Sequence, residues 1–423
     1  MGKILLYAYT LVFLYDIPKC YGLPVSPKFP LMILWAFCAI APRLIRGRKI
    51  LFGMPRSLLL FFLFTFGVSL YQYSLRGSLL SIECLLVYAC FVNHFDSRRD
   101  EVLPYLKYVV GLLLFSCLWL IGSRVVGEPF SHLRESLYAG HVDRFEAGLF
   151  TIIERTGLTF NHFIMGYQIA AGMVLSLFLS FSSKGSARVL WISAVIIFSV
   201  GVIYAAQRSV LPAVVLPLLL SSAARRQARL FLGLIFCIIS VVFVVKYHPL
   251  SDDDAVTIDT RLGDKEDPFA RLSWQVAALS VIAQNPLGDI LGNLDWERQS
   301  QDSGADFSLH EYRPQAVHNS YLGMALLYGW VGGALGGLAL WRVCRVMIFP
   351  CFHRIRIGAE FDIAREICGL GLLACLVNGL FHNASFFTQE PSSWLLLCVA
   401  GAAATMAHRD RAPTANSSAQ EEF

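Results

Sequence analysis

The sequence predicts an all-α integral membrane protein with about twelve transmembrane helices. Of its 423 residues, 56% are hydrophobic and only 15% are charged, whereas soluble domains carry about 25% charged residues. Apolar runs recur along the chain, and a helix of roughly 17–25 residues crosses about 30 Å of hydrocarbon. These observations favour one polytopic membrane domain over residues 1–407 rather than a series of soluble domains.

Each apolar run is expected to form one span. The first run follows Lys3 as in a signal peptide, but no small-residue cleavage site comes after it, so an uncleaved anchor is expected. The expected spans are 4–17, 29–42, 57–73, 78–94, 104–123, 159–182, 189–205, 210–223, 230–247, 318–341, 366–387 and 391–407.

The basic residues predict the orientation. With twelve spans both termini share a side, and the short loops on that side hold most of the Lys and Arg residues. The short loops on the other side hold only Lys19, Lys28, Arg76 and Arg208. Because short loops rich in Lys and Arg stay in the cytoplasm, both termini are expected to be cytoplasmic. Two long loops, about 124–158 and 248–317, then face outward.

The net charge of +5 follows from the cytoplasmic loops and does not imply nucleic-acid binding. All eleven cysteines lie outside the two long loops. A disulfide framework on the oxidising side is therefore not expected. Residues 408–423 are expected to form a disordered cytoplasmic tail.

The larger outer loop is predicted to contain an amphipathic helix at about 268–284, between spans nine and ten. Asp267 and Pro268 are typical of a helix start. Leu272, Val276, Leu279 and Ala283 follow at helical spacing, and Asn-Pro-Leu-Gly at 285–288 ends the run. We expect this helix to lie against the membrane surface with Arg271 in its first turns.

The tenth span contains Gly329, Gly333 and Gly337, four residues apart, with Gly332 and Gly336 beside them. A row of small residues at this spacing lets another helix approach closely. We interpret it as a packing feature.

Two arginines on the outer side are candidates for binding an anionic substrate. Arg208 lies in a short connection, and an arginine at the bilayer centre costs about 2.5–3.5 kcal/mol. It must reach either lipid phosphate or a bound group such as a diphosphate. Arg271 lies near the free amide groups of a helix start, which bind anions. A salt bridge to an acidic neighbour in the loop is its alternative role.

His318 and Asn319 stand where the large loop enters the tenth span. A neutral imidazole there can accept a proton from a sugar hydroxyl, or simply bond to lipid headgroups. Asn319 is a candidate to orient the imidazole or to bind a sugar. Arg155 and His162 lie where the first long loop enters the sixth span, so they are candidates to line the same outer cavity.

Other polar residues have weaker claims. The run Asp252–Asp254 is either a divalent-metal site or, with more weight, a solvated acidic segment. Glu83 lies inside a span, where a carboxylate is either functional or a satisfied interfacial group. The final outer connection holds four polar residues to which no role is assigned: His382, Asn383, Gln389 and Glu390.

Four segments, in this order and on one side, resemble the O-antigen ligase and polymerase family of bacterial membrane glycosyltransferases. ERTGLTFNHFIMGY resembles the family segment that enters a central span, and AQRSVLPAVV its short outer turn with an arginine. RLSWQVAALSVIAQNPLGDILGN is similar to its loop helix. His318-Asn319 followed by nine residues, Gly329, two residues and Gly332 fits its histidine motif.

The resemblance implies a glycan donor on undecaprenyl diphosphate, at the periplasmic face of the bacterial inner membrane. The acceptor would be the lipid A core in a ligase, or a second lipid-linked glycan in a polymerase. It implies that Arg208 and Arg271 bind the diphosphate and that His318 activates the acceptor hydroxyl for inverting attack. No metal or cofactor is implied.

A transporter for a similar lipid is the alternative of a different class. Transporters usually place ionisable groups or broken helices near the middle of the bilayer. The charges of interest here lie at the outer ends of the spans, which favours an enzyme. The sequence predicts no oligomeric state.

Overall fold

The computed structural model describes residues 1–15, 27–126, 158, 162–205, 207, 209–225, 268–302, 317–352, 360–382 and 384–411. At a few helix positions, His162 and Arg271 among them, it describes only the backbone. Over these ranges the protein is all-helical and contains no strand.

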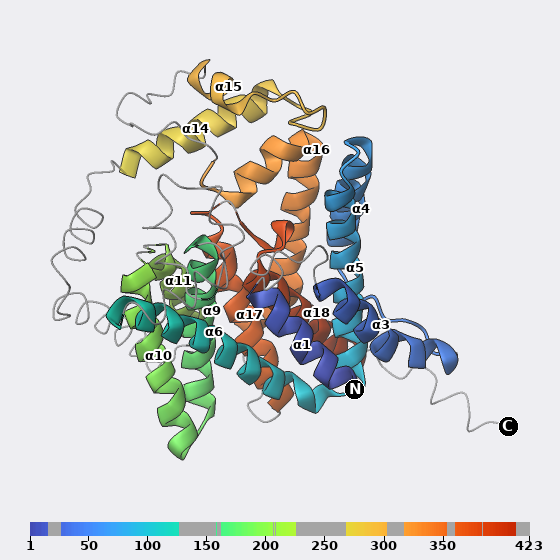
Figure 1. Cartoon of the computed structure of the whole chain (residues 1–423), viewed down its shortest axis with the longest axis vertical. Coiled ribbons are helices and arrows are strands. Elements are labelled where there is room, and N and C mark those ends of the chain that lie inside the picture. The colour runs from blue at the N-terminus through green and yellow to red at the C-terminus, as the bar shows by residue number, and fades with distance from the viewer. Residues whose placement is uncertain are drawn as a thin grey trace.

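Several helices that follow one another in the sequence pack side by side, as α4 does with α5 and α9 with α10 (Figure 1). The first half contains α1 (Gly2–Leu14), α3 (Lys28–Ile45), α4 (Arg56–Tyr71), α5 (Leu75–Asp96), η1 (Arg99–Glu101), α6 (Val102–Val125), α9 (His162–Ser182), α10 (Gly185–Ala205) and α11 (Val210–Arg225). The second half contains α14 (Pro268–Gln284), α15 (Trp296–Asp302), α16 (Ser320–Val343), η3 (Cys344–Ile348), η4 (Phe349–Cys351), α17 (Glu360–Asn378), η5 (Phe386–Thr388) and α18 (Pro391–Arg411).

Six of the described helices are long and apolar enough to cross a membrane. They are α3, α5, α6, α9, α10 and the stretch Ser320–Cys351 that begins with α16. Shorter apolar helices include α1, α4 and α11. The chain is therefore a membrane protein with several apolar helices. A described helix lies at every expected span except the ninth, 230–247, which falls outside the described residues. Twelve crossings remain a prediction.

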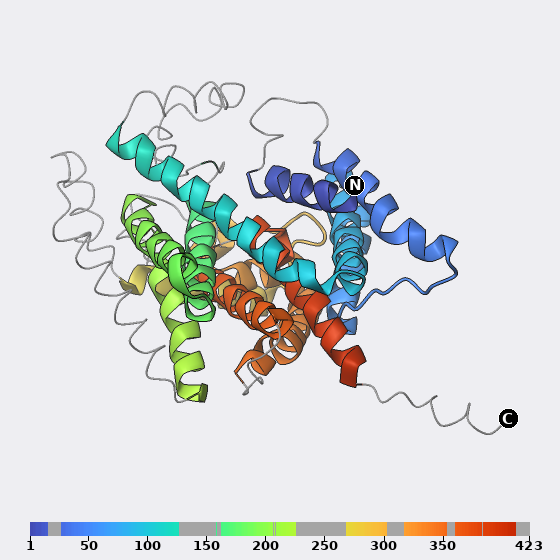
Figure 2. The same ribbon diagram turned by 90° about the horizontal axis from the view of Figure 1, so that it is seen from below.

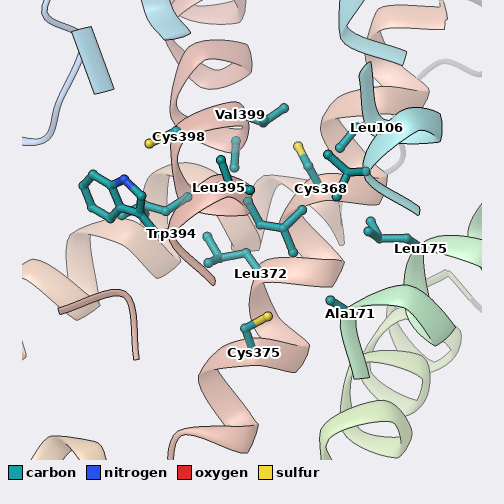
Figure 3. Packing of buried hydrophobic residues seen from close by; sticks show 14 of the residues in the cluster. Leu106, Ala171, Leu175, Cys368, Leu372, Cys375, Trp394, Leu395, Cys398 and Val399 are labelled. Atoms are coloured by element: carbon teal, nitrogen blue, oxygen red, sulfur yellow. The ribbon is translucent and has the colours of Figure 1, made fainter. Parts of the chain in front are cut away.

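The helices α17 and α18 lie in the middle of the bundle. Seen from below, α1 and α3 lie on one side of them and α10 and α11 on the other (Figure 2). Leu372 of α17 lies between Leu395 of α18 and the α9 side chains Ala171 and Leu175 (Figure 3), and all four are fully or almost fully buried. A Cβ on Gly371 would lie 2.9 Å from Leu175 Cδ2, so the glycine lets α9 and α17 pack closely here.

The expected eleventh span, 366–387, does not continue as a helix to its end. The helix α17 stops at Asn378 because the start of α16 caps it. The Ser320 backbone N–H and hydroxyl both donate to the carbonyl of Gly379 at 2.9 Å, and the Tyr321 hydroxyl donates to a carbonyl in the last turn of α17 at 2.7 Å. The chain then turns back through η5 before α18 begins.

Of the α16 glycines noted in the sequence, Gly332 and Gly336 face another helix, α4, as a packing role requires. A Cβ on Gly332 would lie 3.0 Å from Phe64 of α4, and one on Gly336 would lie 3.4 Å from Phe61 of the same helix. A Cβ on Gly337 would meet nothing within 4 Å. Gly329 instead lies at a break in the helix and meets a different segment of the chain.

The break in α16 lies at Gly329, which has φ 63° and ψ −162° inside the helix. Only glycine adopts this conformation readily. The turn that follows α14 fills the break: Trp330 N–H donates to the Pro286 carbonyl at 2.9 Å, and Asp289 N–H donates to the Leu326 carbonyl at 2.9 Å. The broken helix thereby recovers hydrogen bonds from another segment of the chain. We call this crossing of 285–289 over 326–330 the α14–α16 lock.

Two glycines make the lock sterically possible. A Cβ on Gly329 would lie 2.3 Å from the Pro286 carbonyl oxygen, and one on Gly288, with φ 58°, would lie 2.4 Å from the Gly329 nitrogen. The Trp330 indole donates to the Ile282 carbonyl at 2.8 Å, which ties the last turn of α14 to α16. Backbone therefore crosses backbone with no side chain between them.

The helix expected at about 268–284 is present as α14 (Pro268–Gln284). Ala278 and Val281 are buried and form a small cluster with Leu326 of α16. Val276 and Leu279, which belong to the apolar stripe noted in the sequence, are instead each 55% exposed. The helix is apolar on both faces, so the exposed stripe suits contact with lipid.

Ion pairs join the helix ends at the other end of the bundle. Asp96 at the end of α5 pairs with Arg43 of α3, and also with Arg409 of α18 at 2.6 Å. Asp410 pairs with Arg99 of η1 at 2.6 Å, and this hydrogen bond lowers the pKa of the Asp410 carboxyl. The network gathers the ends of α3, α5 and α18 around η1.

The N-terminal helix reaches the same place, since Lys3 Nζ lies 3.9 Å from Glu101 of η1. The first helix therefore begins, and the last helix ends, at one end of the bundle.

Asp96→Asn is expected to lower the free energy of unfolding by about 1–2 kcal/mol. The carboxylate is mostly buried and compensates two guanidinium groups, and Arg43 is itself largely buried, so its loss leaves a partly buried charge uncompensated. Thermal unfolding of the detergent-solubilised protein measures the change. Asp410→Asn is the control, because that pair is exposed and should contribute almost nothing. Equal melting temperatures for the two variants would contradict the prediction.

Candidate functional site

Five ring side chains lie in a row at the end of the bundle opposite the ion pairs. In order they are Trp274, His318, Phe163, His382 and Tyr167, with successive ring centroids 5.3, 6.0, 4.8 and 6.1 Å apart. We call this row the ring ladder. It joins α14, the residues before α16, the start of α9 and the turn after α17, which are far apart in sequence.

His318 lies between two of these rings. The Trp274 ring stacks on it with an interplanar angle of 27°. The Phe163 ring also contacts it, with an interplanar angle of 61° that is typical of an edge contact. The side chain is half-buried. Stacked rings restrict the orientation of an imidazole while leaving its nitrogen atoms at the edge. The arrangement suits a group that accepts a proton from a defined direction.

Asn319 begins α16. Its side-chain oxygen accepts hydrogen bonds from the backbone N–H groups of Tyr321 at 3.0 Å and Leu322 at 3.2 Å. This is the N-cap arrangement, which satisfies amide groups that otherwise have no partner. The side-chain oxygen of Asn319 is thus committed to the helix, and its amide nitrogen is the atom that suits a substrate contact.

The short connection between α10 and α11 reaches the ring ladder through His382. The Ser209 hydroxyl and His382 Nε2 are 2.6 Å apart, and both side chains are buried. Ser209 directly follows Arg208. The connection that carries this arginine is therefore bonded to the ladder, although Arg208 itself lies outside the described residues.

A buried amide lies against the same connection. Asn378, the last residue of α17, has 0% exposure, and among the residues that the structure describes neither of its amide atoms has a hydrogen-bond partner. A Cβ on Gly166 of α9 would lie 3.6 Å from Asn378 Nδ2 and 3.4 Å from Gln207 Cγ. An unsatisfied buried amide costs about 1–3 kcal/mol, so a water or ligand atom that bonds to it would be stabilising.

The turn that carries His382 is anchored at its far end. Gln389 donates to the Leu80 carbonyl of α5 at 2.8 Å. Glu390 accepts from the backbone N–H of Ser392 at 3.0 Å and of Ser393 at 2.6 Å, which caps α18. Burial raises the pKa of the Glu390 carboxyl to about 7, although the bonds from these two serines oppose the rise. Both residues therefore hold the fold around His382.

Glu83 forms an ion pair, and its bonding partners Lys28 and Tyr9 do not belong to the ring ladder. Its carboxylate accepts from Lys28 Nζ at 2.9 Å and from the Tyr9 hydroxyl at 3.2 Å. The carboxylate is buried but compensated. Of the two roles expected from the sequence, the satisfied group is the one that these contacts favour.

The residues singled out in the sequence fall into three groups. His318 and Asn319 are described with their side chains, whereas only the backbone is described for Arg271 in the first turns of α14 and for His162 at the start of α9. Arg155, Arg208, Asn383 and the run Asp252–Asp254 lie outside the described residues. Among the residues that are described, no three metal-ligating side chains gather into one group.

The segments that carry the candidate residues nevertheless meet. Ser209 follows Arg208, Trp274 lies three residues after Arg271, and Phe163 follows His162; each contacts the ring ladder or belongs to it. Trp274 and Phe163 contact His318, whereas Ser209 contacts His382, two rings farther along the ladder.

The sequence assigned no role to several residues of the site: Phe163, Tyr167, Ser209, Trp274, Asn378 and His382. A signal existed for the aromatic residues. Phe163 and Tyr167 are four residues apart directly after His162, so they share a face of α9. Trp274 lies one helical turn from Arg271. Asn378 had no such signal, because only tertiary packing buries it.

The site thus combines an oriented imidazole, a short polar connection and the start of a loop helix at one end of an apolar bundle. Comparison of the chain with protein-family models, with curated proteins and with solved structures gives no match in any of the three.

Proposed function

We propose that the protein is an O-antigen ligase-like glycosyltransferase. It moves a glycan from undecaprenyl diphosphate to the lipid A core at the periplasmic face of the bacterial inner membrane, with inversion and without a metal ion. The observation that carries the proposal is that the connection at 207–209 and the loop helix α14 both reach the ring ladder, the first at His382 and the second at His318. These are the segments on which the sequence resemblance to the family rests.

His318 acts on the acceptor. Its imidazole takes the proton of the acceptor hydroxyl as the hydroxyl oxygen attacks the anomeric carbon of the donor sugar. The bond from that carbon to the diphosphate oxygen breaks, and the electron pair leaves with the diphosphate. The stacking on Trp274 supports this role because it limits the directions from which the proton is taken.

Arg208 and Arg271 act on the leaving group. A diphosphate leaves readily once its developing charge is neutralised, so the reaction needs cations more than a general acid. Arg271 lies in the first turns of α14, where helix amide groups add to the attraction for an anion. Arg155, His162 and the Asn319 amide nitrogen are further substrate contacts in this proposal.

The proposed topology places the ring ladder in the periplasm and both termini in the cytoplasm, with twelve crossings. Two observations support it. The first and last helices approach η1 at one end of the bundle, and α18 leads from there to Glu390 beside the His382 turn at the other end. A helix of this length, at about 1.5 Å per residue, spans roughly 30 Å of bilayer.

Reconstitution in vesicles tests the proposal. Purified protein is given an undecaprenyl-diphosphate-linked glycan and lipid A core, and transfer is expected to continue with a chelator present. Arg208→Ala should slow it roughly ten- to hundredfold, because a charge-assisted hydrogen bond contributes about 1.5–3 kcal/mol. Arg46→Ala, an exposed arginine at the end of α3, is the control and should leave the rate unchanged.

The same experiment separates the alternatives. Growth of the glycan on its carrier, with none on the core, would make the protein a polymerase that uses the same donor chemistry. Movement of the lipid across the vesicle without glycan transfer would make it a transporter and would overturn the proposal. A strict requirement for added magnesium would contradict the metal-independent mechanism and direct attention to the Asp252–Asp254 run.

A further inference from the structure

His382 is the second histidine of the ring ladder, and the proposed chemistry does not use it. Its ring lies between those of Phe163 and Tyr167, and its Nε2 is bonded to the Ser209 hydroxyl. The ring is 4% exposed, so it lies too deep to meet a bulky glycan. What it contacts is the connection that carries Arg208.

The position of His382 is itself well fixed. The Tyr167 hydroxyl donates to the carbonyl of Ala384, two residues farther along the same turn. Gln389 and Glu390 hold the end of the turn to α5 and α18. A side chain held in this way can fix the position of the residue to which it is hydrogen-bonded.

Ser209 is the residue that His382 bonds to, and it directly precedes α11. Its carbonyl accepts from the Ala213 N–H at 3.2 Å, and the Val210 N–H donates to the Gln207 carbonyl at 3.2 Å. The bond to His382 therefore ties the first turn of α11 to the turn after α17. Four residues before His382, Asn378 lies near Gln207 on the other flank of Arg208, with Gly166 between them.

We propose that His382 is a positioning residue for the donor: through Ser209 it holds the connection at 207–209 against the ring ladder, and so sets the affinity for an isoprenyl diphosphate. The segment 378–382 flanks this connection on both sides of Arg208. This inference rests on the proposed function. It gives the two histidines separate tasks, proton transfer at His318 and placement of the diphosphate site at His382.

Binding of undecaprenyl diphosphate to the detergent-solubilised full chain tests the inference. His382→Ala and Ser209→Ala should each raise the Kd about five- to tenfold, since one neutral hydrogen bond contributes about 0.5–1.5 kcal/mol. The double variant should bind no more weakly than the weaker single variant, because both changes remove the same bond. In transfer assays the donor KM should rise while kcat changes little.

Two further variants separate positioning from general loss of structure. His382→Gln places an amide near the position of Nε2 and can still bond to Ser209, so it should restore binding to within about twofold. His94→Gln is the matched control: His94 is also 4% exposed and has one bonded side chain, Glu101, at the ion-pair end. It should leave the Kd unchanged.

Additive losses in the double variant, or wild-type Kd values in His382→Ala and Ser209→Ala, would overturn the positioning role. Wild-type transfer with normal donor binding in these variants would leave the proposed function intact. Failure of the wild-type protein to bind undecaprenyl diphosphate would overturn both, so the two failures are distinguishable.

Discussion

His318→Ala is expected to lower the rate of glycan transfer by about 10²–10⁴-fold, the usual contribution of a positioned general base. The loss should appear in kcat, because the imidazole acts on the acceptor proton in the transition state. Binding of undecaprenyl diphosphate should stay within about twofold of the wild type, since the guanidinium groups proposed to hold the diphosphate are unchanged. Transfer by the purified variant in vesicles, together with a donor titration, measures both quantities.

The control for this variant is His408→Ala. His408 is exposed near the end of α18, on the side of the ion pairs, and its removal should change neither kcat nor KM. His318→Ala should also keep its melting temperature close to that of the wild type, because the half-buried ring contributes mainly the contacts with Trp274 and Phe163. A folded variant with near wild-type transfer would show that the imidazole is not the base.

The positions of the helices were predictable because each long apolar run by itself favours a helix in the membrane or in the protein interior. The loop helix at 268–284 was also predictable, because its two ends have local signals. Pro268 is typical of a helix start, and the turn with Gly288 is typical of a helix end. The early end of α17 was not. It depends on Ser320 and Tyr321, which lie about sixty residues earlier in the sequence and cap the last carbonyl groups of that helix. The hydrophobic pattern of one helix cannot predict a cap that another segment of the chain provides.

The candidate site divides in the same way. His318 stood out because an imidazole at the mouth of an apolar run is unusual. The role of Asn319 as a cap was also readable, since asparagine directly before a helix is among the preferred N-cap residues. The contact of His382 with Ser209 was not readable, because it joins residues 173 positions apart. Neither residue has a local pattern that reveals the other.

The glycines show how a local interpretation can be incomplete. Gly288 at the end of the loop helix was interpreted as a helix stop, and Gly329 as a packing residue. Each interpretation is reasonable from its own neighbours. The structure gives one reason for both: two backbone segments cross, and each needs the other to lack a Cβ. The two motifs of the sequence are halves of the α14–α16 lock.

Gly329→Ala is expected to lower the free energy of unfolding by more than about 2 kcal/mol. Its φ and ψ lie in a region that costs a non-glycine residue about 1–3 kcal/mol, and the new Cβ would lie 2.3 Å from the Pro286 carbonyl oxygen. Because a backbone atom cannot rotate aside, the turn after α14 must move. Thermal unfolding in detergent measures the loss.

Gly337→Ala is the matched control on the same helix. A Cβ there meets nothing within 4 Å, and alanine is favoured over glycine inside a helix by up to about 1 kcal/mol. This variant should therefore be as stable as the wild type or slightly more stable. Equal melting temperatures for Gly329→Ala and Gly337→Ala would show that the crossing does not support the fold.

The lock also has a consequence for activity that is separable from stability. The turn at 285–289 directly follows α14, so a displaced turn moves the helix that brings Trp274 to His318. Gly329→Ala should therefore lose transfer at temperatures where the bundle is still folded, whereas Asp96→Asn, at the opposite end, should lose activity only as it unfolds. Gly288→Ala attacks the same crossing from the other segment. Its effect combined with Gly329→Ala should be less than additive, because either overlap alone already opens the lock.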